Sequence, residues 1–160
     1  MADVEIVNSI VGHLVTRLES LALDAASVHP KLKHDKTLID AERSPTVTDF
    51  RRFRWTFPTR AIPEPLHVGT AALHPRHWRL ALGLEVIYPF GDVRNRLTIA
   101  GVALDDSTRI IHHLEVDFTR VTVAGAYEWC GVEVEAGDLA QASDGFVLPM
   151  TITALFQRAY

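Results

Sequence analysis

The spacing of hydrophobic residues predicts an α-helix at the start of the chain. Over residues 4–23, hydrophobic side chains recur every three or four positions, as they do along one face of a helix: Ile6, Ile10, Leu14, Leu18 and Leu21. Between residues 24 and 49 this spacing is lost, and polar, charged and proline residues dominate. We expect a long loop there. It carries four cations that we expect to become ordered only against a neighbouring protein: Lys31, Lys33, Lys36 and Arg43.

Further along the chain, hydrophobic and polar residues alternate with a period of two, which is typical of strands with one buried face. This alternation predicts strands at residues 53–57, 77–88, 117–123, 127–135 and 150–158. Residues 59–76 contain three prolines and are predicted to be an extended connection. Pro149 stands where we expect the last strand to begin.

A second helix is predicted over residues 106–115, where Asp105 or Asp106 can cap its N-terminus and Ile110, Ile111 and Leu114 share one face. The predicted order is therefore a helix, a long loop, two strands, a helix and three strands. This order indicates an α+β fold, in which the N-terminal amphipathic helix and the second helix pack on one face of a mostly antiparallel sheet. A length of 160 residues fits a single domain over residues 1–160.

Composition and charge exclude several classes of protein. The single cysteine, Cys130, cannot form an internal disulfide, and no hydrophobic run reaches the roughly 20 residues that span a membrane, so we expect a soluble protein. The net charge of −4 argues against a protein whose main function is to bind duplex DNA. Residues 1–100 have a net charge of +2 and residues 101–160 one of −6. This asymmetry suits association through complementary patches, although ordinary surface composition can also produce it.

Candidate catalytic and metal-binding residues each have a simpler explanation. Two neighbouring histidines on one helix, His112 and His113, point about 100° apart and cannot easily share a metal ion. Cys130 lies inside a strand pattern, where a thiol is buried and inert. The sequence has no nucleophile elbow, phosphate-binding loop or dinucleotide fingerprint. We therefore expect no catalytic residue, no metal ion and no cofactor.

Four arginines gather around the first predicted strand: Arg51, Arg52, Arg54 and Arg60. Basic and aromatic residues alternate there, a pattern that also occurs in proteins that bind single-stranded nucleic acid. A solvent-facing row on a strand with an aromatic core behind it predicts the same residues. We assign these arginines to partner binding, through contact with an acidic protein surface such as the acid-rich last third of a neighbouring copy.

Four segments, taken in order, resemble the tail terminator proteins of long-tailed bacteriophages and phage-like particles. They are the amphipathic helix at residues 6–21, LEVIYPFGD at 84–92, DDSTRIIHHL at 105–114 and PMTITALFQR at 149–158. The resemblance covers about half of the chain. Head-tail joining proteins and tube- or sheath-initiating proteins share overlapping architecture and are the nearest alternatives.

The resemblance implies a structural virion protein without catalytic activity. Such a subunit is made in the host cytoplasm and forms a hexameric ring at the head-proximal end of the tail. The ring ends polymerisation of the tail tube protein and joins the tail to the head-tail connector protein; DNA only passes through it, and no membrane is involved. A different class of protein also fits the sequence: a small-molecule-binding or hydrolytic α+β domain whose pocket is lined by Trp55, Trp78 and Trp129.

Overall fold

The computed structural model describes residues 2–23, 29–35, 49–56, 64–65, 77–90, 96–116, 121–123, 127–142 and 144–158. These residues form two helices and eight strands. The helices are α1 (Ala2–Ser20) and α2 (Arg96–Glu115). The strands are β1 (Lys33–His34), β2 (Arg52–Thr56), β3 (Glu64–Pro65), β4 (His77–Pro89), β5 (Val121–Val123), β6 (Tyr127–Ala136), β7 (Ala140–Gln141) and β8 (Gly145–Arg158).

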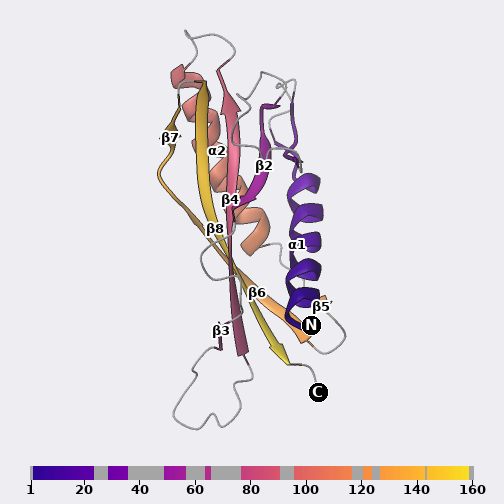
Figure 1. The fold of residues 1–160 in the computed structure, drawn as a ribbon. Coiled ribbons are helices and arrows are strands. Elements are labelled where there is room, and N and C mark those ends of the chain that lie inside the picture. The colour runs from indigo at the N-terminus through magenta and orange to yellow at the C-terminus, as the bar shows by residue number, and fades with distance from the viewer. Residues whose placement is uncertain are drawn as a thin grey trace.

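All eight strands belong to one sheet, in the order β1-β2-β4-β8-β6-β5, with β3 paired to β4 and β7 paired to β8. Every pairing is antiparallel except that of β1 with β2. The two longest strands, β4 and β8, pair along their whole length at the centre of the sheet (Figure 1). The predicted α+β class with a mostly antiparallel sheet is therefore confirmed.

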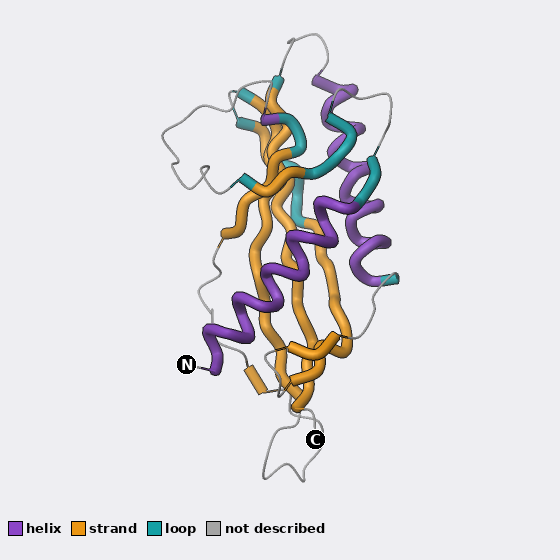
Figure 2. Tube along the Cα trace, turned by 90° about the vertical axis from the view of Figure 1, so that its right-hand side faces the viewer, coloured by secondary structure: helices purple, strands orange, loops and turns teal. Residues whose placement is uncertain are grey.

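One hydrophobic core joins both helices to the same face of the sheet. In α1 the predicted stripe is confirmed at Ile10, Leu14 and Leu18, which are completely buried, whereas Leu21 is half-buried and follows the end of the helix. They belong to one cluster with Ile110 and Leu114 of α2 and with the inward-facing residues of the strands. Figure 2 shows α1 running diagonally along the curled sheet with α2 beside it. The helix α1 contacts both outer strands of the sheet, β1 and β5.

The predicted strand alternation is confirmed in β4 and β8, where every second residue is buried. In β8 the buried residues are Leu148, Met150, Ile152, Ala154 and Phe156. In β6 the prediction of simple alternation is wrong, because the register with β8 shifts between Trp129 and Gly131. This bulge places Trp129 on the same buried face as Val132 and Val134.

Pro149 was predicted to begin the last strand, but it lies inside β8. A proline inside a sheet removes one hydrogen-bond donor, so it needs a position where no partner requires that donor. The carbonyl of Pro149 accepts a hydrogen bond from the Gly137 amide at 2.8 Å. Gly137 lies in the break between β6 and β7, so the side of Pro149 that lacks a donor faces this break.

The second helix begins ten residues earlier than predicted, at Arg96 rather than Asp106. Its buried face includes Ala103, Asp106, Ile110 and Leu114, which repeat at helical spacing. Because Asp106 is charged, the stripe is not continuously hydrophobic, and the pattern of hydrophobic residues did not predict the first half of the helix. Asp105 and Asp106 are therefore residues of the helix interior, not N-caps.

The predicted loop at residues 24–49 contains structure at its centre. The backbone of Ala22 forms a bridge with Lys31, and β1 pairs in parallel with the start of β2. Residues 24–28 and 36–48, with Lys36 and Arg43, lie outside the described residues. So do residues 57–58 and, in the predicted connection, residues 59–63 and 66–76. Among the described helices, none is long and apolar enough to span a membrane.

Candidate interaction site

Arg51, the first residue of the predicted partner-binding row, is part of the protein interior. Its backbone precedes β2 with a φ of 61°, in the left-handed region that residues other than glycine rarely adopt. Backbone hydrogen bonds on both sides hold this conformation. The Arg51 amide donates to the carbonyl of Ile87 at 2.9 Å, and the Arg51 carbonyl accepts from the amide of Lys33 at 3.1 Å.

The Arg51 side chain is only 1% exposed and makes a two-pronged ion pair with Asp106 of α2, which is also 1% exposed. Arg51 Nε lies 2.8 Å from Asp106 Oδ2, and Arg51 Nη2 lies 3.0 Å from Asp106 Oδ1. A third donor, Arg51 Nη1, reaches the carbonyl of His29 at 3.0 Å. The partner-binding prediction is therefore wrong for Arg51, because its charge is neutralised inside the protein.

Tyr88 of β4 completes this buried network, since its hydroxyl donates to Asp106 Oδ2 at 2.9 Å. Burial raises the pKa of Tyr88 well above 10, the Asp106 carboxylate raises it further, and the positive charge of Arg51 opposes the increase. Tyr88 is therefore a neutral hydrogen-bond donor at physiological pH. The network connects β2, β4, α2 and the segment before β1, so it holds the sheet and the second helix in one arrangement.

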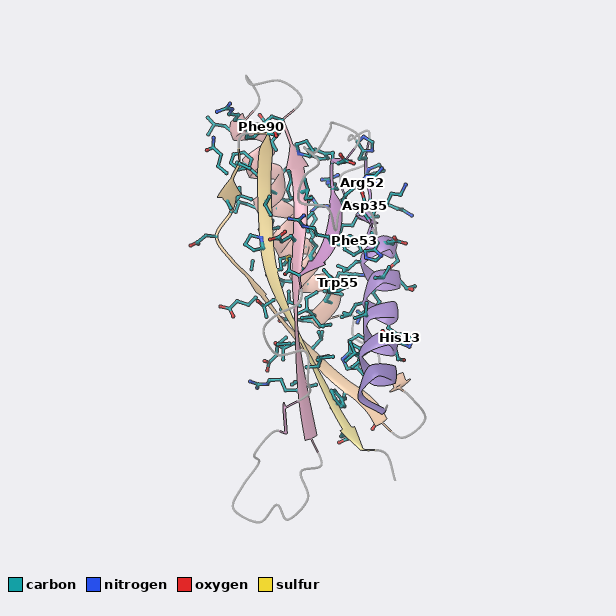
Figure 3. All side chains as sticks on the ribbon, in the orientation of Figure 1. His13, Asp35, Arg52, Phe53, Trp55 and Phe90 are labelled. Carbon is teal, nitrogen blue, oxygen red and sulfur yellow. The ribbon has the colours of Figure 1, made fainter. Side chains whose placement is uncertain are left out.

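Arg52 and Arg54 lie on β2 and remain partly exposed, at 25% and 29% of their side-chain surface. Arg52 pairs with two buried carboxylates, Asp35 at 2.9 Å and Asp49 at 3.3 Å. Figure 3 shows Arg52 and Asp35 beside each other at the outer side of the sheet. Arg54 pairs with Glu85 of β4 at 2.7 Å. Arg60 lies outside the described residues, and partner binding by Arg52 and Arg54 stays a prediction.

The last third of the chain carries acidic residues without neighbouring cations. No lysine or arginine occurs between Arg120 and Arg158 in the sequence. Glu133 and Glu135 of β6 and Asp138 of the break after it are exposed. We call these three residues the acidic edge. The net charge of −6 over residues 101–160 already indicated an acidic last third, and the structure places three of its carboxylates at the surface.

Two exposed lysines lie at the end of the strand order that is far from β6. Lys33 belongs to β1, and Lys31 precedes it by two residues. We call them the lysine edge. Within the described part of the chain neither lysine forms an ion pair. A groove of about 420 Å³ lies beside them, lined also by Glu19, His29, Pro30 and Leu32.

The two neighbouring histidines of α2 differ in their surroundings. His112 is exposed, whereas His113 joins the C-terminal ends of the two helices. The His113 Nε2 atom lies 3.0 Å from the Arg17 carbonyl, which can only accept, and Arg17 Nη2 donates to the His113 carbonyl at 2.7 Å. This reciprocal contact satisfies carbonyls that a helix leaves without a partner at its C-terminus. It explains His113 by helix capping rather than by metal binding.

The three tryptophans of the alternative pocket do not all lie close together in the sheet. Trp129 is completely buried against α1, where its ring lies 6.2 Å from the ring of His13. Trp55 contacts Phe53 on β2 and is in register with Leu84, six residues from Trp78 along β4 and roughly 20 Å away. The backbones of Trp78 and Trp129 flank Phe156 of β8 in the sheet register, and the side chain of Trp78 lies outside the described residues. Trp55 lies apart from both, so the three residues do not line one pocket.

Among the described residues, no three side chains of His, Cys, Asp or Glu lie close enough together to hold a metal ion. Cys130 is half-buried rather than buried as predicted, and its thiol lies 3.3 Å from the carbonyl of Leu155. The sequence holds a second pair of nearby histidines, His74 and His77; His74 and the side chain of His77 lie outside the described part of the structure.

Comparison with known proteins gives no family. No protein-family model matches the chain, and no curated protein matches it. A solved structure aligns with 96% of this chain and 95% of its own length, at 16% sequence identity and a TM-score of 0.47. A similarity of this size supports no argument about family or function, so any functional conclusion depends on the residues themselves.

Proposed function

We propose that this protein is a structural subunit that assembles with copies of itself into a ring at the head-proximal end of a phage tail. In this role it ends polymerisation of the tail tube and joins the tail to the capsid connector. It acts by binding the tube protein, the connector protein and neighbouring subunits, and it has no catalytic function.

The observation that carries the proposal is the separation of charge across one sheet. The acidic edge and the lysine edge lie near opposite ends of the strand order, on β6 and on β1. A subunit with two different, complementary surfaces associates head to tail, and a head-to-tail contact produces a ring when its rotation closes. The resemblance of four ordered segments to tail terminators supports the same role, and those segments coincide with α1, the end of β4, α2 and β8.

Size measurement of the purified chain tests this proposal. We expect light scattering coupled to size-exclusion chromatography to find six times the 17.8 kDa of one chain, and negative-stain imaging to show rings. Addition of the cognate tube protein should place these rings at one end of short tubes. A chain that stays monomeric over a range of salt and protein concentrations, and that leaves tube length unchanged, would contradict the proposal.

A further inference from the structure

We propose that the contact between neighbouring subunits joins the acidic edge of one copy to the lysine edge of the next. This inference rests on the proposed function, because it names the surfaces through which the ring would form. It assigns Glu133, Glu135 and Asp138 to one side of the contact, and Lys31 and Lys33 to the other.

The carboxylates of the acidic edge form no ion pair with the described residues. Its three carboxylates are exposed, and the described part of β6, β7 and β8 provides no cation beside them. Arg79 of β4 is exposed on the same face, two strands away in register with Leu155 and Gly131, and no ion pair joins it to these carboxylates. Like charges so close together repel one another in the free subunit. A cationic surface from outside the chain would remove this repulsion, so the acidic edge fits a basic partner.

The lysine edge is the matching surface on the same molecule. Other cations of this region already have acidic partners, since Arg52 pairs with Asp35 and Arg54 with Glu85. Lys31 and Lys33 are exposed, on either side of the buried Leu32, and neither forms an ion pair with a described residue. They are therefore the cations of this edge that an acidic neighbour can contact.

Both edges also present charge on the same face of the sheet. The residues of β4 that point into the core have even numbers, from Leu80 to Tyr88. Lys33 is in register with Arg52 and thus with Ile87, whereas Glu135 is in register with Thr151 and thus with Gly83. Ile87 and Gly83 are odd-numbered positions, so Lys33 and Glu135 lie on the face away from the core.

The positions of the two edges determine how neighbouring copies would be oriented. Lys33 belongs to β1, at one end of the strand order, and Glu135 to β6, near the other end. Figure 1 shows β2, the neighbour of β1, and β7, which follows β6 in the chain, on opposite sides of the central strands β4 and β8. Copies joined edge to edge would all turn their helices to the same side. Such a contact pairs two different surfaces, so it continues from copy to copy instead of ending in a two-fold dimer.

Reversal of the charges provides the test. One variant carries Glu135→Lys with Asp138→Lys, and the other carries Lys31→Glu with Lys33→Glu. Each variant alone has two edges of like charge, so we expect it to fold but to remain monomeric under conditions in which the unmodified chain assembles. An equal mixture should restore assemblies of the original mass containing both variants, because every contact in an alternating ring is then attractive.

A matched control separates the contact from net charge. The triple variant Thr98→Lys, Asp105→Lys and Thr108→Lys changes exposed positions of α2 and raises the net charge by the same amount as the acidic-edge variant. We expect it to assemble like the unmodified chain. Circular dichroism of each variant establishes that it is folded.

The possible outcomes distinguish this inference from the proposed function. Assembly of either edge variant by itself, at unmodified affinity, would overturn the edge contact and leave the ring proposal intact. The edge contact would also be overturned if folded variants stay monomeric after mixing. Failure of the unmodified chain to assemble at all would overturn both.

Discussion

Arg51 and Arg54 lie three residues apart in the sequence, each paired with a carboxylate, yet they occupy different environments. Arg51 and Asp106 are both 1% exposed, whereas Arg54 and Glu85 are 29% and 24% exposed. Removing one partner from a buried pair leaves an uncompensated charge in a medium that cannot solvate it. At the partly exposed pair, water replaces the lost partner. The comparison shows that an arginine–carboxylate pair is part of the protein interior at one position and remains accessible to water at the other.

The neighbouring aspartates of α2, Asp105 and Asp106, also differ in burial. Asp105 is exposed and pairs with Arg109 one helical turn later at 2.9 Å. Asp106 points to the sheet and binds both Arg51 and Tyr88. Adjacent aspartates thus offer a matched pair of substitutions in which chemistry, helix and sequence context are nearly the same and only burial differs.

The largest effect is expected for Asp106→Asn. The substitution keeps the size of the side chain but leaves the Arg51 charge without a counter-ion, so we expect the free energy of unfolding to fall by about 3–5 kcal/mol. The control Asp105→Asn should change it by no more than about 0.5 kcal/mol. Urea denaturation followed by tryptophan fluorescence measures both. Equal effects from the two variants would show that burial does not distinguish the two pairs.

A double variant tests whether the cost arises from the unpaired charge. Arg51→Met combined with Asp106→Leu removes both charges and fills the space with hydrophobic atoms. We expect it to be about 1–3 kcal/mol less stable than the unmodified protein, through the lost partners of Tyr88 and the His29 carbonyl, and more stable than Asp106→Asn. A double-mutant cycle gives the coupling energy. Additive effects of the two single changes would contradict direct coupling.

Tyr88→Phe should have an intermediate effect, because it removes one buried hydrogen bond to a charged acceptor. We expect the free energy of unfolding to fall by about 1–2 kcal/mol.

The raised pKa of Tyr88 also predicts a pH dependence of stability. The folded state holds this proton more tightly than the unfolded state, so the contribution is fully present below pH 10 and is lost as the pH rises through the folded-state pKa. Stability measured from pH 9 upwards should decline less steeply in Tyr88→Phe. Parallel curves would argue against a raised pKa.

The smallest effect is expected at the partly exposed pair. Arg54→Ala should lower the free energy of unfolding by less than about 1 kcal/mol, and 0.5 M salt should remove most of the difference, because exposed ion pairs are screened. Thermal denaturation at two salt concentrations measures this. A loss as large as that of Asp106→Asn would show that the Arg54 pair is also structural.

Several features of this protein follow from the sequence alone, because they depend on local periodicity. Hydrophobic residues spaced as in α1 can be buried together only on a helix, and the alternation in β4 and β8 only on strands. The order of these elements was sufficient to predict the α+β fold. Their approximate positions also followed, except for the short strands β1, β3 and β7, the first residues of β8, the bulge in β6 and the first half of α2, where the buried Asp106 interrupts the pattern.

The tertiary structure alone decided which charges are inside and which remain available. A hydrophobicity pattern treats Arg51, Arg52 and Arg54 as equivalent polar residues. Only the folded chain brings Asp106, from a helix 55 residues away, against Arg51, and places Asp35 and Glu85 beside the other two. Among the described residues, the same packing leaves Lys31, Lys33 and the acidic edge without ion-pair partners. Ion pairing between distant segments has no period along the chain, so no local pattern can reveal it.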